Sequence, residues 1–269
     1  MLKSDRNIMP DRWCVEERAG SLEQEVIRRD LNSTGISSWT SVQMTPSDLI
    51  ELASCFGPVE MAWEDQHPEH TQLQLLDSRK QQKRIQKGSS QYWHTDRSFV
   101  PFPSRLTFLY AEKIYGEVRA TEFVSMIELT SRIDAAWLDR YGSSEAVHSF
   151  ALNFPKIMRE KGHAEEKINR QISLYPEIRQ PLLRRVNRGR VVYFNELCVR
   201  EVFGLPGVES ENLISDLVSS INSAPRYSKN WREGDLLVWD NYSVIHRGAI
   251  GSANGHRRLL RATTSEYCE

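Results

Sequence analysis

The sequence lacks the features of a membrane-spanning or disulfide-stabilised protein. No apolar run approaches the roughly 18 residues of a transmembrane helix. The opening residues, MLKSDRNIMPDRW, contain no apolar core of a signal peptide, so none is expected. Cys14, Cys55, Cys198 and Cys268 are scattered without a C-x-x-C spacing, which argues against a disulfide framework and a cysteine-rich zinc site. We therefore expect free thiols and a cytoplasmic location.

An excess of charge of either sign is also lacking. The 269 residues include 35 Lys and Arg against 36 Asp and Glu, a formal net charge of −1. A nucleic-acid binder that works through bulk positive charge is therefore not expected. Repeats, low-complexity tracts and a Pro/Gly/Ser linker are missing too. We expect a single domain over 1–269 without membrane contact, and a homo-oligomer is compatible with this composition.

Helix signals come first along the chain. Residues 22–31 have the spacing of an amphipathic helix, and 36–43 resemble a short strand. Thr45 is a predicted N-cap, because Pro46 follows it and Asp48 stands at the capping-box position. That helix should end at Gly57-Pro58.

Short strand-like segments follow, interrupted by two helical stretches. The predicted strands are 105–110, 120–124, 190–194 and 235–238, and the predicted helices are 127–141 and 209–222. Helices early and short strands late favour a β-sandwich or open barrel with helices packed outside.

The most polar and basic segment is DSRKQQKRIQK, at 77–87. A loop of this length fits an active-site lid over 77–90. A solvated surface loop has the same composition, and the sequence leaves both interpretations open.

Three of the seven histidines are followed two residues later by a carboxylate. The pair at 67–69 lies in a charged, proline-containing segment typical of a surface loop, and the pair at 163–165 lies in a charged helix-like segment. His94 and Asp96 lie in QYWHTDRSFVPF, which is apolar and extended. Alternate residues of an extended segment share a face, so imidazole and carboxylate can bind one metal ion. A partly buried ion pair would explain the same two residues.

A third ligand would complete the facial triad of two histidines and one carboxylate that non-haem Fe(II) oxygenases use. His246 is the best candidate, because it follows a strand-like run at 234–241 that ends in a turn. Arg257 comes eleven residues later and could place a cation near the metal. A surface or capping role for His246 is the alternative. Zinc accepts the same ligands, so a zinc-dependent hydrolase is a second class of function.

These motifs together resemble the taurine dioxygenase/TfdA family of Fe(II)- and 2-oxoglutarate-dependent oxygenases. The motifs are WHTD followed by SF, WDN before His246, and Arg257 and Arg261 before Ala-Thr. The helix ending FGPVE and the segment RVVYFNELCVREVFGLP are similar as well. The resemblance spans roughly residues 20–265, and motif types, order and spacings agree together.

The resemblance implies a mainly β fold with flanking helices, the double-stranded β-helix or cupin-like jelly roll. His94, Asp96 and His246 would be the catalytic metal ligands, with Fe(II) as cofactor and 2-oxoglutarate and O2 as co-substrates. The C5 carboxylate of 2-oxoglutarate would bind Arg257 and Thr121, which lies 25 residues after Asp96 as in the family.

Two features near these residues depart from the family or leave a choice. The segment 116–120, GEVRA, lacks the paired glycines usual before this threonine. On a strand Arg257 and Arg261 share a face and Arg258 takes the other, although a slip by one residue would reverse this. The family spacing favours Arg257.

Arg261 has no obvious protein partner in the sequence, so we predict that it binds an anionic group of the primary substrate. A structural ion pair is the alternative. The substrate would be a small acid such as an amino acid, a sulfonate or a natural-product intermediate. Hydroxylation is the default outcome, while desaturation or cyclisation would use the same residues. A non-catalytic jelly-roll module is a third class, against which the intact triad argues.

Overall fold

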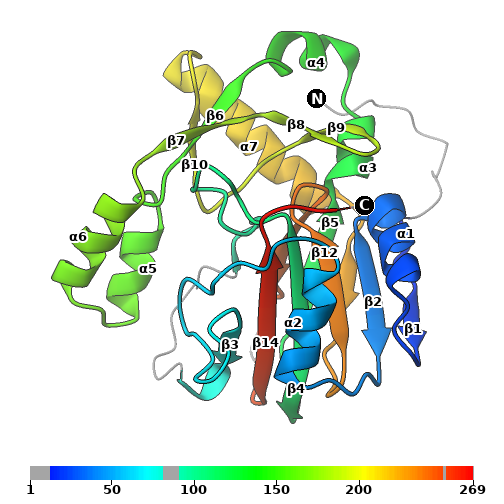
Figure 1. Ribbon diagram of the computed structural model, residues 1–269. Coiled ribbons are helices and arrows are strands. Elements are labelled where there is room, and N and C mark those ends of the chain that lie inside the picture. Colours follow the sequence, from blue (N-terminus) through cyan, green and yellow to red (C-terminus); the bar gives the residue numbers. More distant parts are fainter. Residues whose placement is uncertain (1–12, 81–90, 251–252, 269) are drawn as a thin grey trace.

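The computed structural model describes residues 13–80, 91–250 and 253–268, which form a strand-rich, mixed α/β structure (Figure 1). The helices are α1 (Gln24–Thr34), α2 (Pro46–Ser54), α3 (Met126–Ser131), α4 (Ala135–Tyr141), α5 (Phe154–Glu160), α6 (Glu165–Leu174), α7 (Gly207–Ser223) and a 3-10 helix (Ser78–Lys80). The strands are β1 (Glu17–Ala19), β2 (Ile36–Thr40), β3 (Gln74–Asp77), β4 (Leu106–Tyr115), β5 (Thr121–Ser125), β6 (Glu145–His148), β7 (Ile178–Pro181), β8 (Leu183–Val186), β9 (Gly189–Val192), β10 (Val199–Val202), β11 (Tyr227–Lys229), β12 (Leu236–Asp240), β13 (Val244–Gly248) and β14 (His256–Thr264).

The largest sheet has six strands in the order β1-β2-β12-β4-β14-β3. β1 is parallel to β2, and the other neighbours are antiparallel. A second sheet has the order β11-β5-β13. Because β12 and β14 lie on either side of β4, the late part of the chain completes the sheet that the early part begins.

The six-stranded sheet buries a different set of side chains on each face. On one face, Phe108 and Leu260 pack with residues of α1 and α2, which lie against this sheet (Figure 1). On the other face, Leu109 and Leu259 pack with Phe123 of β5 in the second sheet. This alternation is the two-residue period of a strand, and it places an apolar interior between the two sheets.

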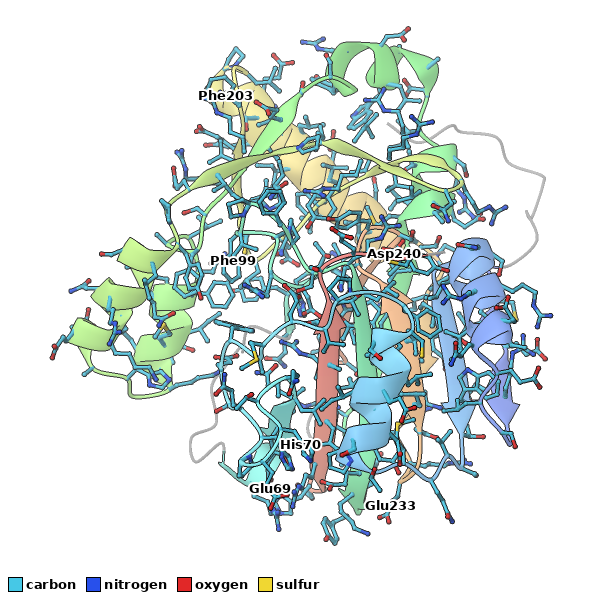
Figure 2. All side chains as sticks on the ribbon, viewed as in Figure 1. Glu69, His70, Phe99, Phe203, Glu233 and Asp240 are labelled. Carbon is cyan, nitrogen blue, oxygen red and sulfur yellow. The ribbon has the colours of Figure 1, made fainter. Side chains whose placement is uncertain are left out.

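A third layer covers one end of this sandwich. The sheet β10-β6-β7, the hairpin β8-β9, and helices α3, α4 and α7 share a separate apolar core. α5 and α6 lie to one side of it (Figure 1). Figure 2 shows Asp240 at the end of the sandwich that faces this layer and Glu233 at the opposite end.

The helix predicted from Thr45 is confirmed. Thr45 accepts a hydrogen bond from the backbone N–H of Asp48, and the Asp48 carboxylate accepts one from the backbone N–H of Thr45. The helical stretch predicted near 127–141 consists of two helices, α3 and α4. Asp134 caps the second of them by accepting from the backbone N–H of Trp137 at 2.7 Å.

Three further expectations had different outcomes. The strand predicted over 36–43 ends at Thr40, because Ser41 has a φ of 59°. The surface position predicted for His67 is wrong: its side chain is buried, and its Nδ1 accepts from the backbone N–H of Glu69 at 3.2 Å. The predicted lid over 77–90 lies largely in 81–90, outside the described residues.

Within the ranges described, no helix is both long and apolar enough to cross a membrane.

The capping box of α2 gives a prediction about stability. Thr45→Ala should lower the free energy of unfolding by about 1 kcal/mol, because the first turn of the helix loses its side-chain acceptor. Urea unfolding followed by circular dichroism measures this. The control is Ser47→Ala, an exposed serine in the same first turn, which should change the free energy of unfolding much less. Equal effects of the two changes would contradict a capping role.

Candidate metal centre

A backbone pairing brings His94 and His246 together. The backbone N–H of each residue donates to the carbonyl oxygen of the other, with both N–O distances at 2.9 Å. His246 lies on β13, which pairs with β5, whereas His94 lies in the segment before β4. A reciprocal bridge of this kind fixes the register of the two segments, so both imidazoles face the same side.

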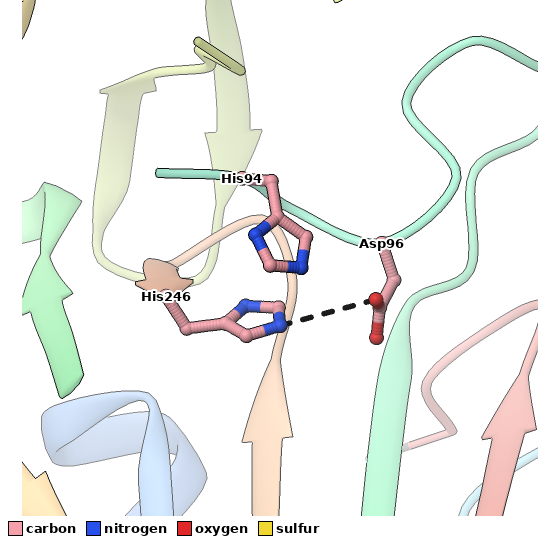
Figure 3. A group of neighbouring side chains, drawn as sticks. All are labelled: His94, Asp96 and His246. Atoms are coloured by element: carbon pink, nitrogen blue, oxygen red, sulfur yellow. Dashed lines mark ion pairs between the residues drawn. The ribbon is translucent and has the colours of Figure 1, made fainter. Parts of the chain in front are cut away.

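The third residue, Asp96, completes the group (Figure 3). His94, Asp96 and His246 each offer one ligand atom, and these atoms all lie within 4.8 Å of one another. The His246 Nε2 to Asp96 Oδ1 distance is 3.9 Å. The structure therefore brings the three sequence-predicted ligands into one cluster.

The two imidazoles are held in different ways. His94 Nδ1 lies 2.8 Å from the carbonyl oxygen of Tyr92, which can only accept, so Nδ1 carries the proton and the Nε2 lone pair is free. The His246 ring packs against two aromatic rings, Phe123 at 5.6 Å and Trp239 at 5.0 Å between centroids, and these two rings also contact each other. Packing therefore orients one ring, and a hydrogen bond orients the other.

Several donors surround the Asp96 carboxylate. Thr107 Oγ1 donates to Oδ2 at 2.7 Å, and Arg261 Nη1 donates to Oδ1 at 3.2 Å. The backbone N–H of Asp96 donates to Asn241 Oδ1 at 3.2 Å. The Thr107 and Arg261 contacts satisfy the carboxylate of a residue that is only 5% exposed, and together with the backbone contact they fix its direction toward the histidines.

At neutral pH the three side chains of the triad have the protonation states that metal ligands need. Burial lowers the pKa of His246 to about 3 and also lowers the pKa of His94, so both imidazoles are neutral. Burial alone would raise the pKa of Asp96, but the Arg261 cation and the Thr107 hydroxyl help hold it at about 2. Two neutral nitrogens and one ionised oxygen form the donor set of a facial Fe(II) site, and these residues fit that ion.

Two residues that support this group were not among the predicted site residues. Asn241 Nδ2 donates to Thr107 Oγ1 at 2.8 Å, and Thr107 in turn donates to Asp96. Asn241 also accepts from Trp239 Nε1 at 3.0 Å. Asn241 belongs to the WDN motif, which was a usable signal. Thr107 could be found only once β12 and β4 were known to be neighbours.

The structure places Arg257 and Arg258 of HRRLLRATT on opposite sides of β14. Arg258 points to the opposite side from Arg257 and forms an ion pair with Glu112 at 2.6 Å. Arg257 Nη1 donates to the carbonyl oxygen of Arg119 at 3.0 Å. Arg257 has no carboxylate partner among the described residues, and burial together with the Arg119 cation lowers its pKa to about 10. A cation in these surroundings is a site for an anion.

Thr121 begins β5, two residues after the Arg119 carbonyl that accepts from Arg257. Thr121 is 7% exposed, and its hydroxyl accepts a hydrogen bond from Trp231 Nε1 at 2.9 Å. Thr121 therefore lies two residues after the carbonyl group to which Arg257 is bound.

The expectation that Arg261 lacks a protein partner is wrong. Its guanidinium forms an ion pair with Asp96 at 3.2 Å. The sequence could not show this, because Asp96 lies 165 residues away along the chain and the two meet only through the sheet. Arg261 therefore lies directly beside the metal ligands.

The fold and the triad define a class, the non-haem Fe(II) oxygenases. The family model "Taurine catabolism dioxygenase TauD, TfdA family" matches residues 16–263, and the chain belongs to this family. It is a dioxygenase that depends on Fe(II) and on 2-oxoglutarate (α-ketoglutarate) and acts on a small molecule. Family and triad together favour this class over a zinc hydrolase or a non-catalytic module.

Two curated relatives illustrate the similarity. The α-ketoglutarate-dependent 2,4-dichlorophenoxyacetate dioxygenase of Cupriavidus pinatubonensis is 26% identical over 93% of this chain and 91% of its own. Pentalenolactone F synthase of Streptomyces arenae is 27% identical over 75% of this chain and 71% of its own.

Solved structures show the same fold. AAD-2 in complex with Mn(II) and N-oxalylglycine has a TM-score of 0.71 and 19% identity, covering 92% of this chain and 88% of that one. A taurine dioxygenase from Burkholderia xenovorans has a TM-score of 0.72 and 17% identity, covering 91% and 83%.

The Thr107 hydroxyl gives a prediction about metal affinity. Thr107→Val should weaken Fe(II) binding about 10–100-fold, because Asp96 loses the donor that fixes its direction. Anaerobic titration against a competing chelator measures this. Thr40→Val, which removes a β2 hydroxyl that donates to the Arg18 carbonyl, is the control and should leave the affinity unchanged. Unchanged affinity in Thr107→Val would show that the Asp96 direction is set elsewhere.

Proposed function

We propose that His94, Asp96 and His246 hold Fe(II), and that Arg257 and Thr121 bind the C5 carboxylate of 2-oxoglutarate. The observation that carries this assignment is the Arg257 cation, which has no carboxylate partner among the described residues. It lies on the same strand as Arg261, and Arg261 contacts the triad residue Asp96. We further infer that the two packed sheets form a double-stranded β-helix within one domain over 1–269, which the matches to taurine dioxygenase structures support.

The residues of this chain have distinct roles in the proposed reaction. Bound iron would supply the activation of O2 and the oxidising power. The neutral imidazoles and the ionised Asp96 would be its three protein ligands, and the co-substrate and O2 would bind it beside them. Arg257 neutralises the far end of 2-oxoglutarate and so orients its keto acid end toward the metal. Halogenation is disfavoured, because Asp96 occupies the position that a halide would need.

Arg261 is the proposed binding residue for an anionic group of the substrate. A guanidinium has five N–H donors, and the contact with Asp96 uses only Nη1. The names of several relatives specify acids: a dichlorophenoxyacetate, a phenoxypropionate and a sulfonate. A small acid is therefore the proposed substrate class, with hydroxylation as the default and desaturation or cyclisation as alternatives.

Two broader assignments accompany this proposal. A natural-product intermediate is one form of the small acid, and the similarity to pentalenolactone F synthase supports it. A reducing, cytoplasmic location is supported by four cysteines that are all free thiols.

Visible spectroscopy tests the cofactor assignment. Anaerobic addition of Fe(II) and 2-oxoglutarate should give a weak metal-to-ligand charge-transfer band. His94→Ala, Asp96→Ala and His246→Ala should each lower Fe(II) affinity sharply and remove the band, because each deletes one of three ligands. His67→Ala and His163→Ala are the controls. Loss of iron binding in a control but not in His246→Ala would refute the triad.

Arg257 gives a prediction about the co-substrate. Arg257→Ala should raise the KM for 2-oxoglutarate at least about 30-fold, since losing one partner of a desolvated charge pair costs about 2–5 kcal/mol. Arg258→Ala, which removes only the pair with Glu112 on the other face, should have a much smaller effect. Steady-state kinetics with varied 2-oxoglutarate compare the two. Near-equal effects would overturn the assignment.

Arg261 gives a prediction about the primary substrate. Arg261→Ala should raise the KM for substrate and increase the succinate formed per product, because a loosely held C–H bond reacts less often. The affinity for 2-oxoglutarate should change little. Parallel assays of succinate and product measure the coupling. Tight coupling with an unchanged substrate KM would show that the pair with Asp96 is the whole role of Arg261.

A further inference from the structure

Trp231 makes a buried contact with Thr121, a residue proposed to bind the co-substrate. It lies two residues beyond β11 and is 5% exposed, and its Nε1 donates to Thr121 Oγ1 at 2.9 Å. The rest of its side chain belongs to the apolar interior between the two sheets, together with Leu109 and Leu259. The indole therefore approaches Thr121 from the interior of the sandwich.

The chemistry of the two groups fixes the direction of the hydrogen bond. An indole N–H can only donate, so Thr121 Oγ1 must accept with one of its lone pairs. The hydroxyl proton then has to point elsewhere. Within residues 13–80, 91–250 and 253–268 this proton has no protein acceptor. Thr121 is thus left as a donor whose proton points away from the indole.

The loop that carries Trp231 is firmly anchored. Lys229 Nζ and Asp235 Oδ2 form an ion pair at 3.2 Å, and both side chains are 1% exposed. Asp235 Oδ2 also accepts from the backbone N–H of Arg232 at 2.7 Å. Gly234 closes the turn with a φ of +82°, and its N–H donates to the carbonyl oxygen of Ala111. These contacts hold the indole in place before any ligand binds.

The donor direction matters because of what lies nearby. The Arg257 guanidinium is bound to the carbonyl oxygen of Arg119, two residues before Thr121. We propose that Trp231 is a positioning residue for 2-oxoglutarate: its N–H orients the Thr121 hydroxyl as a donor to the C5 carboxylate that Arg257 binds. This inference rests on the proposed function of Arg257 and Thr121.

Binding measurements on the Mn(II)-loaded protein, without turnover, test this role. N-oxalylglycine carries a metal-chelating oxalyl end and a distal carboxylate, whereas oxamate carries the oxalyl end alone. Trp231→Phe removes the N–H and keeps an aromatic ring. It should raise the Kd for N-oxalylglycine by about three- to ten-fold, the range for one lost hydrogen bond. The Kd for oxamate, measured by competition, should stay the same. In turnover, the KM for 2-oxoglutarate should rise while kcat at saturation is unchanged.

A double-mutant cycle separates an effect through Thr121 from a general loss of packing. Thr121→Val should weaken N-oxalylglycine binding, and adding Trp231→Phe to it should weaken binding no further. Trp137→Phe is the matched control. Trp137 is also a buried tryptophan, but its Nε1 has no hydrogen-bond partner among the described residues, so its loss should leave both Kd values unchanged. If Trp231→Phe does not fold, β-(3-benzothienyl)alanine at position 231 keeps the indole shape and replaces the N–H with sulfur.

Each outcome decides one point. A larger Kd for N-oxalylglycine alone, lost in the Thr121→Val background, supports the positioning role. Additive effects, equal losses for oxamate, or no change in Trp231→Phe while Thr121→Val weakens binding would overturn that role and leave the proposed function standing. If neither Thr121→Val nor Arg257→Ala changes the Kd for N-oxalylglycine, the proposed function fails as well.

Discussion

The two backbone hydrogen bonds between His94 and His246 are the contact on which the metal centre depends. They join the segment before β4 to β13, and β13 is itself held in register by β5. A shift by one residue in this pairing would turn one imidazole away from the other. The geometry of the triad is therefore a consequence of sheet register, and the side-chain contacts refine it.

Charge distribution in the site follows a simple division. Asp96, the only carboxylate of the triad, is balanced within the protein by Arg261 and by the Thr107 hydroxyl. Arg257, on the same face of β14, is left without an acidic partner among the described residues. The contacts of Asp96 keep this metal ligand ionised despite its burial. Arg257 remains available to bind an anionic ligand.

Local signals in the sequence were sufficient where the determining contacts are local. The capping box at Thr45 and Asp48 involves residues three apart, and the helix begins there as expected. The break at Asp134 was missed even though its signal is equally local, because an aspartate within a helical pattern is common. The burial of His67 was missed because charge and proline nearby gave a surface pattern that tertiary packing overrides.

The sequence by itself determined the ligand types, their order along the chain and the alternation that sends Arg257 and Arg258 to opposite faces. These depend on side-chain chemistry and on the two-residue period of a strand, which are properties of short segments. Only the tertiary structure decided that Arg261 pairs with Asp96, that Thr107 supports it, and that Trp231 lies against Thr121. Those contacts join residues that are far apart in the chain, except for Thr107, which lies on β4, 11 residues after Asp96. They exist because the pairing of β12, β4 and β14 and the packing of the second sheet fix distances that no local pattern encodes.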